Sequence, residues 1–231
     1  MHKIDRRHKY IIVLDTETAN TFKEGNSLDC QSALVYDIGW CIMDTRGNVY
    51  EEYSYMVREI FIESPDLMRT AYYGHKREEY ARDVREGKRT VANWLTIRKT
   101  FAECCEKYNV QVIAAHNARF DYTAMQTTTR LLTGSRIRYF APYGIEWWDS
   151  VKMARSVMLK MPTYQQFSRT NGTLTKNGRL SASAENLYKF ITNDPTFIES
   201  HTGLEDVRIE REIIKTCLRQ HKKMVKKLWK D

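Results

Sequence analysis

The sequence has 231 residues, of which 42% are hydrophobic, so the chain is long enough and apolar enough to bury the core of one α/β domain. It contains 37 lysine and arginine residues against 29 aspartate and glutamate residues, which gives a formal net charge of +8. This excess favours a polyanionic partner over a small neutral substrate, although a solvated lysine face is the competing explanation.

The cysteines and the N-terminus exclude several classes of protein. Five cysteines are an odd number, and none forms a Cys-x-x-Cys pair, which argues against a disulfide framework and against a structural zinc site. The apolar run that follows the charged residues 1–9 is too short for a signal peptide or a membrane span. We therefore expect a cytoplasmic protein with reduced thiols and no membrane contact.

The first apolar segment, residues 10–18, ends in two carboxylates that are one residue apart. The run from Ile11 to Leu14 predicts a buried strand, and Asp15 and Glu17 follow where this strand leaves the sheet. Side chains at positions i and i+2 of a strand share one face. Two such carboxylates repel each other unless a cation lies between them, so the segment predicts a divalent metal site, with a solvated strand end as the alternative.

The elements that follow alternate between strands and helices. In chain order they are strands at 33–43 and 49–57, a helix at 91–108, a strand at 110–115, a helix through 132, a strand at 145–149, and helices at 151–158, 183–191 and from 203 onward. The first three strands predict an antiparallel meander, because a turn signal at 44–48 separates the second strand from the third.

Two segments fit this pattern poorly. Residues 64–88 are charged and aromatic with weak helical periodicity, and residues 160–182 carry two Asn-Gly pairs that predict a small hairpin or loop. Three basic residues of the second segment, Arg169, Lys176 and Arg179, could contact a substrate backbone, but an exposed turn-rich insertion is the favoured interpretation. The lysine-rich residues 221–231 are predicted to be the basic end of the last helix, where cations are favoured.

Three separated motifs are informative when they are read together. They are Asp15-x-Glu17 after the first strand, Asn117-x-x-Phe120-Asp121 at a strand-to-helix junction, and His201-x-x-x-x-Asp206 before the final helix. In this order they resemble the three exonuclease motifs of the DEDDh family. That family comprises the ribonuclease-H-like 3′–5′ exonucleases, among them RNase T and the proofreading subunit of bacterial replicative polymerases.

The resemblance implies the fold class and the domain organisation. It predicts a ribonuclease-H-like α/β fold with a mixed five-stranded sheet flanked by helices in a single domain. The exonuclease domain is expected at residues 8–220, with the insertions near 64–88 and 160–182, and it is followed by the basic helix end at 221–231.

The resemblance also implies the roles of the site residues. Asp15, Glu17, Asp121 and Asp206 would hold two divalent ions, Mg²⁺ or Mn²⁺, with Asp15 between them. Two ions ~4 Å apart can stabilise both the attacking and the leaving oxygen of a phosphodiester. His201 would be the general base that takes a proton from the attacking water, and an ordinary imidazole pKa of about 6.5 suits this task.

Further residues are assigned to the substrate or to packing. Thr18 and Asn117 are expected to bind the terminal nucleotide. Aromatic candidates for stacking on the last bases are Phe22, Tyr72, Tyr73 and Phe120, of which Phe120 is expected to be core. His116 is expected to orient or pack, and His75 to be a surface residue.

The sequence therefore predicts a two-metal 3′–5′ exonuclease that releases nucleoside 5′-monophosphates, with single-stranded DNA ends favoured as the substrate. Trimming of RNA ends is the alternative within the enzyme class. A catalytically silent module that binds nucleic acid or a polymerase is the alternative from another class. A DNA polymerase or replication complex is an expected partner, with a role in proofreading, and the oligomeric state stays open.

Overall fold

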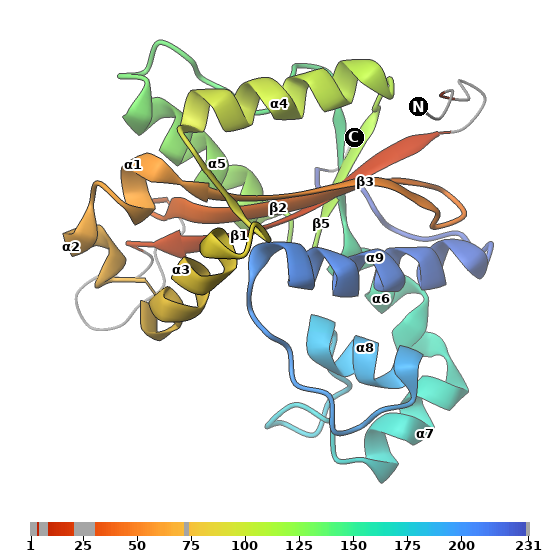
Figure 1. The fold of residues 1–231 in the computed structure, drawn as a ribbon. Helices are drawn as coiled ribbons and strands as arrows, with labels where there is room; N and C mark the ends of the chain where they lie inside the picture. The colour runs from red at the N-terminus through yellow and green to blue at the C-terminus, as the bar shows by residue number, and fades with distance from the viewer. Residues whose placement is uncertain (1–3, 5–8, 21–30, 72–73, 230–231) are drawn as a thin grey trace.

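The computed structural model describes residue 4 and residues 9–20, 31–71 and 74–229. A six-stranded sheet crosses the molecule in the order β4-β3-β2-β1-β5-β6 (Figure 1). The strands are β1 (Tyr10–Ala19), β2 (Leu34–Asp44), β3 (Val49–Val57), β4 (Thr90–Ala92), β5 (Val112–Ala115) and β6 (Glu146–Asp149).

The sheet is mixed, as the sequence predicts. Strands β1, β2 and β3 form the expected antiparallel meander, whereas β5 pairs parallel to β1, β6 parallel to β5, and β4 parallel to β3. The expected number of strands was five, and the sixth is the three-residue β4 at the sheet edge. The helix was expected to begin at residue 91, but Asn93 caps it two residues later, because its side chain accepts a hydrogen bond from the Thr96 amide at 2.8 Å. Residues 90–92 are therefore left to pair as a strand.

Helices cover both faces of the sheet in a single domain. Helices α4 (Trp94–Lys107) and α5 (Arg119–Leu132) cover one face, and α9 (Gly203–Arg219) crosses the other (Figure 1). Three further helices lie on the α9 side, namely α6 (Ser150–Ser156), α7 (Pro162–Thr170) and α8 (Ala184–Thr192). The short elements are α1 (Arg58–Phe61), α2 (Pro65–Met68), η1 (Gly74–Lys76), α3 (Arg77–Arg85) and η2 (Met158–Lys160).

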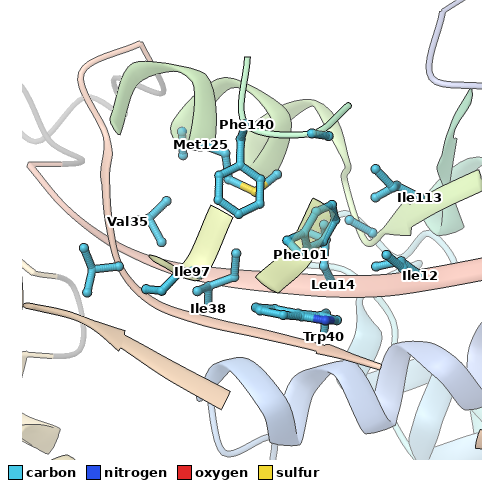
Figure 2. Close-up of a cluster of buried hydrophobic side chains, with 14 of the residues drawn as sticks. Ile12, Leu14, Val35, Ile38, Trp40, Ile97, Phe101, Ile113, Met125 and Phe140 are labelled. Atoms are coloured by element: carbon cyan, nitrogen blue, oxygen red, sulfur yellow. The ribbon is translucent and has the colours of Figure 1, made fainter. Parts of the chain in front are cut away.

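The side chains of β1 alternate between two hydrophobic cores. Ile12 and Leu14 pack with Trp40 and Phe101 on the α4 and α5 side, where Figure 2 shows them between the sheet and the helices. The odd-numbered Ile11 and Val13 pack in the second core, with apolar residues of α9 that include Val207 and Ile213. The face that carries Ile11 and Val13 therefore continues into Asp15 and Glu17 and points toward α9.

The C-terminal residues differ from the prediction. Helix α9 ends at Arg219, and His221 follows with a positive φ of 50°, so the prediction that 221–231 is the end of a helix is wrong for the residues that the structure describes. Residues 225–228 instead run along β6, where an isolated bridge joins Lys227 to Trp148. The segment covers the edge of the sheet that β6 would otherwise expose.

The two unassigned segments are partly helical. The first contains α2, η1 and α3, and the second contains α7 and then one antiparallel bridge between Leu174 and Leu180, with Gly178 at a φ of +67° in the turn. The predicted hairpin is thus reduced to a single bridge. Ser183 caps α8 as expected, because its hydroxyl accepts a hydrogen bond from the amide of Asn186. No helix in the described ranges combines the length and apolar character needed to cross a membrane.

Candidate functional site

The candidate site begins where β1 leaves the apolar core. Asp15 lies opposite Gly39 in the antiparallel register of β1 and β2, and Glu17 lies opposite Asp37. A register shift follows between Glu17 and Thr18, and the pairing continues in the shifted register with Thr18 opposite Val35. The two carboxylates therefore sit on the α9 face of the sheet, directly beyond Ile11 and Val13.

The first turn of α9 packs closely on this part of the sheet. A Cβ atom on Gly39 would lie 2.4 Å from the amide nitrogen of Leu204, and a Cβ on Gly203 would lie 2.9 Å from the amide nitrogen of Gly39. The helix and the strand can pack at this short distance because Gly39 and Gly203 have no side chains. Asp206 is in the same helical turn, and carboxylate oxygens of Asp15, Glu17 and Asp206 lie within 4.8 Å of one another.

Asp121 reaches the site from the other face. It is buried in the first turn of α5, and its Oδ1 accepts hydrogen bonds from the amide of Thr16 at 3.1 Å and from the Thr16 hydroxyl at 2.8 Å. Thr16 lies between Asp15 and Glu17, so these hydrogen bonds fix the start of α5 next to the part of β1 that carries the two carboxylates. Asp121 stands outside the group of three carboxylates, but its charge still acts on Asp15.

The four carboxylates are unfavourable together as anions. Burial raises the pKa of Asp121 to about 7 and that of Asp206 to about 8. Burial also raises the pKa values of Asp15 and Glu17, and the neighbouring carboxylates raise them further. Among the described residues, the buried oxygens Asp15 Oδ2 and Asp206 Oδ1 have no hydrogen-bond partner. Clustered, buried and unpartnered carboxylate oxygens suit hard divalent cations, so the residues fit the implied metals.

Glu210 is a fifth buried carboxylate that the sequence analysis missed. It follows Asp206 by four residues on α9, and its Oε2 accepts a hydrogen bond from the amide of His116 at 3.0 Å. Burial raises its pKa, and the charges of Asp121 and Asp206 add to this shift. The sequence contains a signal for this position, because Glu210 follows Asp206 by four residues and residues at i and i+4 share one face of a helix.

His201 lies in the loop before α9, next to the carboxylates. Its backbone has a positive φ of 51°, and one ring nitrogen, Glu199 and Asp206 offer ligand atoms within 4.8 Å of one another. The side chain is 37% exposed. Partial burial lowers the pKa of His201, and the charge of Lys76 lowers it further. Lys76, from the first insertion, donates a hydrogen bond to the His201 carbonyl at 3.4 Å.

A buried ion cluster supports the loop that carries His201. The guanidinium of Arg89 contacts Asp37 at 3.1 Å, Asp83 at 3.1 Å and Glu205 at 2.6 Å. Asp37 in turn accepts a hydrogen bond from the amide of Gly203 at 3.0 Å. Each charged group of the cluster therefore has an ionic or hydrogen-bonding partner. Because Asp37 is in β2 and Gly203 and Glu205 are in α9, the cluster ties β2 to the start of α9. The sequence gives no local signal for it, because its members are far apart along the chain.

The other predicted residues are placed as follows. Thr18 is buried in β1, whereas Asn117 is exposed with a positive φ of 64° between β5 and α5. His116 bonds Ser150 and the carbonyl of Ala182 through its two ring nitrogens, and burial lowers its pKa to about 4, which agrees with the predicted packing role. Phe120 packs against the first core as expected.

The remaining residues singled out in the sequence are exposed or lie outside the described residues. His75 is exposed in η1, as predicted. Arg169, Lys176 and Arg179 are also exposed. Phe22, Tyr72 and Tyr73, which are predicted to stack on bases, lie outside the described residues.

Similarity to solved structures is strong in shape and weak in sequence. A crystal structure of a full-length 3′-exonuclease superposes with a TM-score of 0.60 at 13% identity, covering 93% of this chain and 83% of that one. The nuclease domain of 3′hExo, a DEDDh family member bound to rAMP, also gives a TM-score of 0.60, at 12% identity over 97% of this chain and all of that one. This chain has the fold of the DEDDh 3′-exonucleases.

A bacterial relative of this fold is more distant. The E. coli ExoI–ssDNA complex gives a TM-score of 0.50 at 16% identity over 93% of this chain, which spans 42% of that protein. No protein-family model and no curated protein matches the sequence. The similarity to these exonucleases therefore lies in the three-dimensional fold, at 12 to 16% sequence identity.

Proposed function

We propose that this chain is a metal-dependent 3′–5′ exonuclease that hydrolyses the terminal phosphodiester bond of a nucleic acid. One observation carries the proposal. Asp15, Glu17 and Asp206 converge from a strand and a helix that are almost two hundred residues apart in sequence, with Asp121 tied to Thr16 beside them. The fold of known DEDDh exonucleases supports the same reading.

The proposed cofactor is a pair of Mg²⁺ or Mn²⁺ ions held by Asp15, Glu17, Asp121 and Asp206. When bound, such ions neutralise the negative charge that develops on the phosphate during the displacement. The carboxylates of this chain supply the oxygen ligands, and the two unpartnered oxygens of Asp15 and Asp206 are the most available of them. Glu210 adds a buried negative charge behind this set.

In the proposed reaction, His201 accepts a proton at a ring nitrogen from the water that attacks the terminal phosphorus. Its lowered pKa keeps the imidazole neutral at pH 7, so that it can act as a base. A new bond forms between the water oxygen and phosphorus, and the bond from phosphorus to the 3′ oxygen of the preceding nucleotide breaks. The products are a nucleoside 5′-monophosphate and a chain that is one nucleotide shorter.

The end of the substrate is expected to meet residues beside the carboxylates. Thr18 follows Glu17 on β1, and Asn117 lies between β5 and the helix that carries Asp121. We propose that the backbone at Thr18 and the side chain of Asn117 bind the terminal nucleotide. Lys76 brings a positive charge to the same place, close to Glu17, Asp206 and His201, where it would attract the substrate phosphate.

DNA is the proposed substrate, and RNA is the second candidate. The ExoI structure holds single-stranded DNA, whereas the more similar 3′hExo nuclease domain holds rAMP and another 3′-exonuclease structure contains a histone mRNA stem-loop. These ligands belong to those proteins, and both chemistries fit a site for phosphodiesters. A cytoplasmic location, a polymerase partner and a role in proofreading stay predictions from the sequence.

The test uses oligonucleotides of DNA and of RNA, each labelled at the 5′ end or the 3′ end. They are incubated with the protein in Mg²⁺, in Mn²⁺ and in EDTA, and the products are resolved on sequencing gels. We expect a ladder from the 5′-labelled strands and immediate release of mononucleotide from the 3′-labelled strands, in metal only. If the 5′-labelled strands are not shortened and the 3′ label is not released in either metal, the proposal is wrong.

A further inference from the structure

The C-terminal segment is anchored to the edge of the sheet and carries side chains that the proposed reaction does not use. The amide of Asp149 donates to the carbonyl of Lys226 at 2.7 Å, and the amide of Leu228 donates to the carbonyl of Trp147 at 2.8 Å. The ammonium group of Lys152 adds a hydrogen bond to the Leu228 carbonyl at 2.6 Å. These bonds hold the following residue, Trp229, at a defined place with half of its surface exposed.

Trp229 separates two hollows that differ in character. On one side is a groove of about 800 Å³ lined by cations and apolar groups, namely Lys152, Arg155, Met224, Val225, Lys226 and Lys227. On the other side is a smaller pocket of about 170 Å³ with an aromatic lining, including Tyr122, Tyr139, Tyr143 and Trp147. None of the described residues that line either hollow has a carboxylate side chain.

The positive charges crowd one another in this region. The ammonium groups of Lys226 and Lys9 lie 4.0 and 5.2 Å from the centre of the Trp148 ring. Partial burial lowers the pKa of Lys226, and the charge of Lys9 lowers it further. Glu146 supplies one nearby negative charge through its ion pair with Lys227 at 3.1 Å. Crowded cations with so little local compensation favour the approach of a polyanion.

The aromatic surface and the candidate site share helix α5. Tyr122 follows Asp121 in α5, and its ring meets Trp229 edge to face at a centroid distance of 4.8 Å. It also contacts Trp147 in the same geometry at 5.3 Å. Helix α5 therefore carries a carboxylate of the candidate site and a ring of this aromatic surface at consecutive positions.

We propose that the surface formed by Trp229, Tyr122, Tyr143, Arg155 and Lys226 is a second binding site for the single-stranded part of a nucleic acid that lies outside the cleavage site. Exposed aromatic rings interleaved with cations are what unpaired bases and their phosphates bind, because any base can stack and any phosphate can pair with a cation. This inference rests on the proposed function, since it assumes that the substrate is a nucleic acid.

The test separates binding from cleavage. Fluorescence anisotropy in EDTA measures the affinity of a 5′-labelled 24-nucleotide oligo-dT for the full chain, and for Trp229→Ala, Trp229→Phe and the double variant Arg155→Ala/Lys226→Ala. A matched control removes one arginine and one lysine elsewhere, Arg46→Ala/Lys99→Ala, both of which are exposed and line neither hollow.

We expect Trp229→Ala to weaken binding at least fivefold, Trp229→Phe to restore most of it, and the double variant to reduce the salt dependence by more than one phosphate contact. With metal present, the variants should lose more of the cleavage rate on the 24-mer than on a dinucleotide. Wild-type affinity in both sets of variants, or equal losses on long and short substrates, would overturn the proposed surface. Absence of any cleavage by the wild type would overturn the proposed function instead, and the EDTA binding data would still decide on the surface.

Discussion

Asp15 lies opposite Gly39 in the pairing of β1 with β2, and the first turn of α9 packs on this point of the sheet. The contact brings Asp206 to Asp15 and Glu17. The absence of a side chain at Gly39 is thus what allows carboxylates from the two ends of the chain to share one site.

Substitution Gly39→Ala tests this relationship. The added Cβ would meet backbone atoms of Gly203 and Leu204 at 2.4 to 2.6 Å, so the helix start must shift. We expect a loss of unfolding free energy of about 3 kcal/mol, together with loss of stabilisation by metal. Gly134→Ala is the control for a methyl group added in open space, because no atom lies within 4 Å of its Cβ; its positive φ of 55° adds a backbone strain that Gly39 does not have. Equal metal stabilisation in Gly39→Ala and wild type would contradict the argument.

Substitution of Asp15 should separate stability from activity. Asp15→Asn removes one of several mutually repelling carboxylates, so we expect a higher melting temperature in EDTA at pH 8 and no detectable cleavage in metal. Asp44→Asn, on the neighbouring strand, is the matched control and should have the opposite effect on stability. Burial disfavours the Asp44 carboxylate, but hydrogen bonds from Asn48, Arg46 and Tyr50 outweigh it and lower its pKa. An active Asp15→Asn enzyme would show that the site is misassigned.

The pH dependence of metal binding follows from the raised pKa values. Unfolded carboxylates titrate near pH 4, whereas Asp121 and Asp206 in the folded protein titrate at about 7 and about 8. Between these limits the folded state holds more protons, so the metal-free protein loses stability as the pH rises. Because metal binds the deprotonated carboxylates, the gain in melting temperature from Mg²⁺ should grow from pH 5 to pH 8.

Differential scanning fluorimetry in Mg²⁺ and in EDTA measures this gain. We expect it to reach on the order of 5 °C at pH 8 for a concentration of Mg²⁺ far above its dissociation constant. Asp15→Asn should remove most of it. A gain that is constant with pH, or that survives this substitution, would mean that the ions bind elsewhere on the protein.

The proposed role of His201 predicts the acidic limb of the rate profile. Partial burial and Lys76 lower the pKa of His201, so at saturating metal the limb should have its midpoint below pH 6.5. His201→Ala should lower the rate at neutral pH by ~100-fold or more and flatten the limb. Lys76→Gln should move the midpoint upward, because one charge that disfavours the imidazolium is gone. An unchanged profile in His201→Ala would exclude histidine as the base.

Much of the site could be predicted because each part has a local signal. The alternation of Ile11, Val13, Asp15 and Glu17 places the two carboxylates on one strand face, and in the structure this face meets α9. Asp121 and Asp206 each follow a recognisable strand-to-helix or loop-to-helix junction, and both are in the first turn of a helix as the sequence suggests. Local periodicity and motif order were sufficient for these residues.

The remaining features depend on contacts between distant residues. The i+4 spacing places Glu210 on the helix face of Asp206, but only the packing of α9 on the sheet shows that its carboxylate is buried. The lysines after Arg219 read as a helix end, whereas the structure turns them onto β6 through hydrogen bonds from Asp149 and Leu228. No pattern within either segment encodes this pairing, so the sequence alone could not predict the surface at Trp229.

The most direct measurement is a crystal structure of the protein soaked with Mn²⁺ and a nucleoside 5′-monophosphate, with data collected at a wavelength where manganese scatters anomalously. The account predicts two anomalous peaks among Asp15, Glu17, Asp121 and Asp206, with the nucleotide phosphate beside them and within reach of His201. No anomalous peak at these carboxylates, or peaks only at other acidic residues, would contradict it.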